Sequence, residues 1–371
     1  MKRLLARTLL AAVLALSSST VLAQQADPRD YELGYFAPNN SVAINVYARH
    51  EGATKPRDYT ATTGIFRATH LIKKGEWVFV PFDVLLPVTN LTVNTTLDNP
   101  VRTLVSHASG LGDLLWIPTM GTGLLQNATN HTHTWFALTP YVTFPTGNYS
   151  TKNAVNTGGN RFIFRPQVVL GQRFARAFTV EAFANVAIYG KNDEYRVSPL
   201  AIGAISAQAA ALAPIVAGTL GGNREMKQDP SVGAALLTAM DLSPTFMLTA
   251  SYYYSMNGRQ DLDIEVPDGL PPQLAQVLQS YDTPQYKQKI HTLRFGMGIR
   301  VEKQTLLLFQ LNQDVASENA SISRGFFVRV THLFFPPPKP QSRPQIEAPA
   351  GQGQPPPPPE ARPEPPQPPK S

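Results

Sequence analysis

The sequence predicts an all-β fold, a transmembrane antiparallel β-barrel of the outer-membrane type with about 12 strands and a disordered, Pro-rich C-terminal tail. Three observations predict this fold. The chain begins with an export signal, apolar and polar residues alternate over many segments, and the connections between those segments alternate in length.

Residues 1–23 are the first element, a signal peptide. A basic start precedes an apolar run from Leu9 to Leu16, and small residues lead to Ala23. Spanning a bilayer takes roughly 20 apolar residues, so we expect cleavage after Ala23 and export rather than an anchor helix. Its removal lowers the formal net charge from +6 to +3, a balance that indicates no nucleic-acid partner.

Residues 24–40 precede the first strand and begin in the periplasm. This segment either folds into the barrel as a plug or remains a periplasmic stub, with Tyr31, Tyr35 and Phe36 at the membrane interface. The chain has no cysteine, so neither disulfides nor thiolate metal sites hold it together.

Residues 41–335 form the predicted barrel. Its clearest strand is RFIFRPQVVLGQRF, from Arg161 to Phe174, where arginines share one face and phenylalanines the other. In a membrane barrel the arginines face a wet interior and the phenylalanines face lipid. Pro140 and Pro166 each remove a backbone donor and predict local irregularity. Similar segments lie near 41–51, 63–73, 76–89, 110–124, 133–146, 160–174, 177–190, 230–242, 245–257, 287–301, 304–314 and 323–335.

The connections predict which end of the barrel faces the periplasm. Short turns are expected at 73–76, 174–177, 241–244 and 301–303, and longer loops near 90–109, 147–159, 191–229 and 258–286. Short turns are periplasmic in this class, so both termini should be periplasmic. The Ala-rich insertion at 196–227 is either a short helix at the extracellular mouth or a tolerated surface insertion.

The inward-facing polar residues are the candidate permeation site. Arginines outnumber carboxylates among them, which favours anions or aromatic faces through charge and cation–π contact. The alternative is that Arg and Glu pair across a filled interior. The predicted set is Tyr141, Arg161, Arg165, Arg173, Glu181, Asn185, Arg294, Arg300, Gln310, Asn312 and Arg329.

No catalytic residue, cofactor or metal site is predicted. His131 and His133 would share a strand face but have no third ligand nearby, and Ser109 beside His107 has no nucleophile elbow around it. Residues 336–371 hold nearly half of the 34 prolines and cannot form a core, so they form either an inert tail or a stiff periplasmic spacer that meets a partner.

Several short motifs occur in order along the chain. They are PRDYE at 28–32, GLGD at 110–113, PTGNY at 145–149, NRF at 160–162, YGKNDEY at 189–195, QDP at 228–230 and DVASEN at 314–319. In these motifs the chain resembles the outer-membrane β-barrel family of the MetA-pathway of phenol degradation, described as transporters. That family's loop at the positions between Glu194 and Gln228 is usually short, and its chains usually end near the position of Phe334.

The resemblance implies an outer-membrane channel or transporter that admits small hydrophobic or aromatic compounds to the periplasm, and it supplies no catalytic residues. The expected partners are outer-membrane lipid, such solutes, and a periplasmic partner of the Pro-rich tail. The alternative is a structural barrel that transports nothing and tethers the outer membrane to that partner.

Overall fold

The computed structural model describes the barrel and parts of its connections. The predicted signal peptide, the Pro-rich tail and most of 24–36 lie outside the described residues. The described residues are 30, 37–54, 58–98, 101–127, 132–153, 155–175, 177–196, 213–263, 268–272, 275–276, 287–302 and 304–334.

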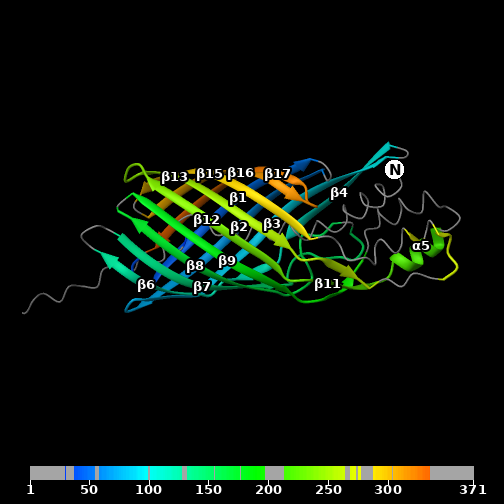
Figure 1. Cartoon of the computed structure of the whole chain (residues 1–371), viewed down its shortest axis with the longest axis horizontal. Helices are drawn as coiled ribbons and strands as arrows, with labels where there is room; N and C mark the ends of the chain where they lie inside the picture. Colours follow the sequence, from blue (N-terminus) through cyan, green and yellow to red (C-terminus); the bar gives the residue numbers. More distant parts are fainter. Residues whose placement is uncertain are drawn as a thin grey trace, which may run out of the picture. The chain divides into compact units, whose positions relative to one another are not determined.

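The strands form one closed antiparallel barrel of twelve membrane strands (Figure 1). Pairing of the first strand with both the second and the last closes the wall, which removes every open edge from the lipid. In chain order the barrel strands are β1 (Ser41–Thr54), β2 (Asp58–Lys74), β3 (Trp77–Asp98), β4 (Val101–Leu111), β5 (Leu114–Trp116), β6 (Thr119–Asn127), β7 (Thr132–Phe144), β8 (Ile163–Phe174), β9 (Phe178–Tyr189), β12 (Ser231–Asp241), β13 (Phe246–Asn257), β15 (Gln288–Glu302), β16 (Thr305–Glu318) and β17 (Ile322–Phe334).

Three of these segments make up one membrane strand. β4, β5 and β6 all pair with β3 and are separated by short breaks, at 112–113 and at 117–118. β5 and β6 then pair with β7, whereas β4 pairs with β3 alone among the described strands. The first break therefore lies where β4 leaves the wall of the barrel.

Beyond the long-loop end of the barrel lies a small second sheet. It consists of β10 (Asn192–Tyr195), β11 (Arg224–Gln228) and β14 (Gln260–Leu262). Helix α5 (Ala213–Leu220) falls within the Ala-rich insertion, and α5, β11 and β4 lie toward the same end of the barrel (Figure 1). No described helix is long and apolar enough to cross a membrane.

The alternation of side chains follows the predicted pattern. In β8 the outward Phe164, Val168 and Leu170 are exposed, whereas Arg165 and Gln167 are buried. Pro140 of β7 lies opposite Pro166 of β8, and the pairing of β8 with β9 is interrupted at Arg165 and Pro166. This interruption is a local irregularity of the kind that the prolines predict. Outward apolar residues face lipid because the membrane replaces the core as the apolar phase.

One predicted loop is wrong. Residues 90–109 were expected to be a long connection, but β3 continues to Asp98 and β4 starts at Val101, with Val88 opposite Leu111. A second difference is smaller: the strand expected from residue 160 begins at Ile163. The ladder of the β3–β4 hairpin continues past the roughly 10 residues that a strand needs to cross a bilayer.

Candidate functional site in the barrel lumen

All eleven predicted lining residues lie on the inward-facing positions of their segments. Eight are buried and the other three, Arg173, Asn185 and Arg300, are half-buried. Arg161 precedes β8 and donates to Gln228 Oε1 of β11 at 2.5 Å, so it lies at the long-loop end. Arg300 donates to the Pro244 carbonyl at 2.8 Å, at the short-turn end. The set therefore extends along the whole interior; that solutes pass along it stays a prediction.

Guanidinium groups lie over aromatic rings at several heights. The Arg165 guanidinium is 4.2 Å from the Tyr141 ring centroid, and Arg161 is 4.5 Å from Tyr189. Arg294 stands 4.7 Å from Tyr253 and 5.7 Å from Phe327. Each contact combines charge with a flat apolar face, which suits a solute that is itself an aromatic ring.

A second group of arginines is bound by carboxylates. Asp83 accepts hydrogen bonds from Arg67 Nε at 2.8 Å and Nη2 at 2.6 Å, a bidentate pair. Asp30, the one described position of 24–36, accepts from Arg67 at 3.4 Å and from the buried Arg329 at 2.5 Å. Asp30 thus contacts two inward-facing arginines, on β2 and β17, before the chain enters β1.

Two further ion pairs lie within the barrel. Arg49 and Glu51 are neighbours on the inward face of β1 and form a buried pair. Arg173 of β8 contacts Asp241 of β12 at 3.0 Å, near the short-turn end. The predicted excess of arginine over carboxylate is therefore reduced by Asp30, Asp83, Glu51 and Asp241, which the sequence-based set does not contain.

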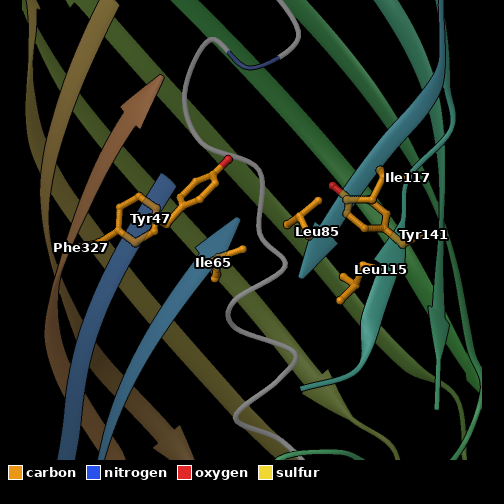
Figure 2. Packing of buried hydrophobic residues seen from close by; sticks show 7 residues of the cluster. All are labelled: Tyr47, Ile65, Leu85, Leu115, Ile117, Tyr141 and Phe327. Carbon is orange, nitrogen blue, oxygen red and sulfur yellow. The ribbon is translucent and has the colours of Figure 1, made fainter. Parts of the chain in front are cut away.

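The interior also holds apolar side chains. In Figure 2 they point inward from walls that face each other, Tyr47 and Phe327 on one side and Tyr141 and Ile117 on the other. An aqueous pore would be lined by polar groups, so buried apolar clusters favour solutes with apolar surface. The cluster in Figure 2 is Tyr47, Ile65, Leu85, Leu115, Ile117, Tyr141 and Phe327, and a second cluster is Ala137, Val169, Phe183, Ala235, Leu237 and Tyr253.

A cavity lies on the inner side of β1 to β5, above the first of these clusters toward the long-loop end. Its empty volume is about 670 Å³ with adjoining open solvent included. The lining comes from four strands, the break between β4 and β5, and one loop: Arg49, Glu51, Ala61, Thr63, Ile65, Leu85, Pro87, Thr89, Leu91, Gly112, Asp113, Leu115, Asn156 and Thr157.

The loop at 145–162 is anchored to the break after β4. Asp113 accepts hydrogen bonds from the backbone N–H groups of Gly147 at 2.9 Å and Gly159 at 2.7 Å. A Cβ on Gly147 would lie 2.7 Å from the Gly158 backbone, so the close approach requires glycine. Asn148 N–H donates to the Leu111 carbonyl at 2.8 Å, which occupies part of the edge of β4 that no strand covers.

The family-like motifs from 110 to 230 converge here. Asn192 Nδ2 donates to the Tyr149 hydroxyl and to the Gly159 carbonyl, both at 3.3 Å, and Tyr149 donates to the Glu194 carbonyl at 3.1 Å. Burial raises the pKa of Tyr149, so its phenol stays neutral and able to donate. Motifs far apart in sequence therefore make one structure at the rim above the cavity.

The match to a family model covers residues 33–261, more than half of the chain. The family is described as "Putative MetA-pathway of phenol degradation". The chain belongs to this family. None of the curated proteins compared with the chain matches it.

A solved structure shows the same fold. The crystal structure of an outer membrane channel from Pseudomonas putida F1 matches with a TM-score of 0.63 and 20% identity, over 84% of this chain and 100% of that chain. The beta domain of the Bordetella autotransporter BrkA is more distant, with a TM-score of 0.42 and 10% identity, over 80% and 100%. With its family and its closed barrel, the protein is an outer-membrane β-barrel of bacteria.

Sequence reasoning missed Arg49, Glu51, Arg67, Asp83 and the function of Asp113. The signal for the first two was available, because SVAINVYARHEGAT places Asn45, Arg49 and Glu51 on one face and Val42, Ile44 and Val46 on the other. Among the described residues no group of acidic and histidine side chains could hold a metal ion. His133 is buried and stacks on Trp135 with centroids 5.5 Å apart, and His131 lies outside the described residues.

Proposed function

We propose that the protein is an outer-membrane channel that admits small hydrophobic, aromatic compounds to the periplasm. The observation that carries this proposal is the interior itself, where two apolar clusters lie among guanidinium groups stacked on aromatic rings. The family and the barrel fold support transport, and the proposal gives no residue a catalytic function.

The interior offers an aromatic solute two favourable contacts. Its faces can pack on residues such as Phe183, Leu237 and Tyr253, which recovers the hydrophobic free energy of leaving water. A guanidinium such as that of Arg165 can lie over the ring, worth about 0.5–2 kcal/mol according to how well water is excluded. A hydrophilic solute of the same size gains neither, so the channel should prefer the aromatic.

The test is uptake of a labelled simple aromatic by intact cells with and without the protein, beside a hydrophilic solute of similar size. Faster entry of the aromatic alone is the expected result. Equal acceleration of both solutes would mean a general pore, and no acceleration of either would exclude transport of this class.

A charge reversal locates the pathway. Arg165→Glu should slow aromatic entry, because the variant replaces the guanidinium over the Tyr141 ring with a carboxylate. The matched control is Arg324→Glu, since Arg324 is exposed at an outward position of β17. Equal effects of the two reversals would indicate general damage to the barrel.

A further inference from the structure

The cavity on the inner side of β1 to β5 differs from the rest of the lumen in its charge. Its lining contains one cation, Arg49, and two carboxyl groups, Glu51 and Asp113. Arg49 is paired with Glu51, with side-chain exposures of 6% and 4%. The cavity therefore offers no excess positive charge, and a carboxylate or phenolate entering it would meet two acidic side chains.

Part of the wall of the cavity is apolar. Ile65, Leu85 and Leu115 belong to the cluster in Figure 2, and Ala61 and Leu91 belong to a third cluster that includes Val155 of the loop. These side chains come from neighbouring strands and from the loop, so they surround the space on several sides. Such a lining suits the faces of a single flat ring.

A pair of hydroxyls supplies the polar contact. Thr63 Oγ1 and Thr89 Oγ1, on adjacent strands, lie 3.1 Å apart, and both residues line the cavity. One hydroxyl donates to the other, which leaves one O–H and several lone pairs for a ligand. A ligand hydroxyl can accept the first and donate to the second, whereas a carboxylate can only accept.

The loop at 145–162 covers this space from the long-loop end. Asn156 and Thr157 line the cavity, and the Thr157 hydroxyl donates to the Leu111 carbonyl at 2.8 Å. The two backbone hydrogen bonds to Asp113 hold the same loop on its other side. The cavity is thus bordered by strands of the barrel wall and by a loop that is hydrogen-bonded to that wall.

We propose that this cavity binds one uncharged, single-ring aromatic that carries a hydroxyl group, in preference to an aromatic carboxylate. The inference rests on the proposed function in one respect, that the ligand is a solute on its way through the channel. It also gives an order to the lumen, because neutral rings are selected at the cavity before they reach the Arg294 contacts deeper in the barrel.

The test measures the binding of three fluorinated probes to the purified full-length protein in detergent. Binding is measured by ¹⁹F NMR, and the signal change in empty micelles is subtracted. The probes are 4-fluorophenol, 4-fluorotoluene and 4-fluorobenzoate. We expect saturable binding of 4-fluorophenol, weaker binding of 4-fluorotoluene by about three- to tenfold, the usual value of one hydrogen bond, and none of 4-fluorobenzoate. Saturable binding of 4-fluorobenzoate as tight as that of 4-fluorophenol would overturn the proposal.

Two variants place the site. Ala61→Phe fills the cavity and should abolish saturable binding of 4-fluorophenol, and its control Thr62→Phe adds the same ring at the neighbouring exposed position. Thr89→Val removes a hydroxyl without changing shape and should cancel the preference for 4-fluorophenol over 4-fluorotoluene. Its control is Thr92→Val, since Thr92 faces away from the cavity and contacts His107.

The gel mobility of unboiled samples shows whether each variant folds. If Ala61→Phe does not fold, Thr89→Val decides, because an unchanged preference there contradicts the proposal. Retained binding in a folded Ala61→Phe contradicts it as well. Binding without faster uptake in cells would refute only the proposed transport, and uptake without saturable binding would refute only this site.

Discussion

Two regions of the same lumen differ in the charged side chains that line them. The cavity is lined by two carboxyl groups and one cation, and one of these carboxyl groups, that of Asp113, accepts hydrogen bonds from backbone N–H groups. Around the aromatic contacts, arginines such as Arg165 and Arg294 lie over rings. Both regions share one apolar cluster, since Tyr141 and Leu115 belong to it.

The difference indicates that one interior can select by two properties in succession. On our proposal the cavity discriminates against negative charge, and the stacked arginines favour a flat, polarisable face. A lumen lined throughout by unpaired arginines would instead attract any small anion. The carboxylates that pair with Arg49, Arg67, Arg173 and Arg329 are what separates this barrel from such a pore.

The largest effect is expected where a buried carboxylate is removed from its arginine. Asp83→Ala leaves the half-buried Arg67 with Asp30 at 3.4 Å, so the loss should lie near the lower limit, about 3 kcal/mol, of what breaking a buried pair costs. Urea unfolding of the barrel in detergent should show the loss, and the exposed Asp193→Ala should not change the midpoint. A small loss would show that the arginines in this region do not depend on their carboxylates.

The next effect concerns the cavity region. Asp113→Ala leaves the N–H groups of Gly147 and Gly159 without an acceptor, at about 1–3 kcal/mol for each group that stays buried. Hydrogen exchange should rise in residues 146–159 and remain unchanged in β15 to β17. Asp113→Asn keeps one carbonyl oxygen and should give an intermediate result; equal exchange in all three proteins would mean that the loop is held by other contacts.

A smaller effect should separate the two regions by function. Arg294→Lys keeps the charge but loses the planar group over Tyr253 and Phe327, which should change aromatic uptake by about 0.5–1 kcal/mol, or a few fold. Arg300→Lys is the control, because the Arg300 guanidinium donates to the Pro244 carbonyl at the rim. Saturable binding of 4-fluorophenol should be the same in both variants; a loss in Arg294→Lys would merge the two regions into one site.

The smallest effect lies outside the lumen and provides an exposed reference for the buried pairs. Hydrogen bonds from Lys227 and Lys191 lower the pKa of Glu225 in β11. A lowered folded pKa means that this contribution to stability is present above the ordinary pKa of Glu and is lost as the pH falls through the lowered value. An NMR titration should show the low pKa, and Lys191→Ala with Lys227→Ala should return it toward normal without changing uptake.

Most of the fold could be predicted from the two-residue period of the strands. The wrong prediction of a loop at 90–109 has a physical reason. Alternation records the contrast between lipid on one side and the lumen on the other. Residues 90–98 and 101–109 pair as strands, but the alternation in NLTVNTTLD is the reverse of that in the membrane strands, with Leu91 and Val93 buried and polar residues between them. A hairpin that extends past the membrane does not need an apolar outer face. The turn between β3 and β4 was marked only by Asn99 and Pro100.

The sequence by itself determined the class of fold, the number of strands and the inward position of residues such as Arg165, Gln310 and Arg329. A period of two tells which face a side chain lies on, because successive residues of a strand point to opposite sides. It does not tell the height at which two distant strands meet. Only the tertiary structure decided that Asp30 contacts Arg329, that Asp113 accepts from Gly147 and Gly159, and that residues of β1, β2, β3 and β5 line one cavity.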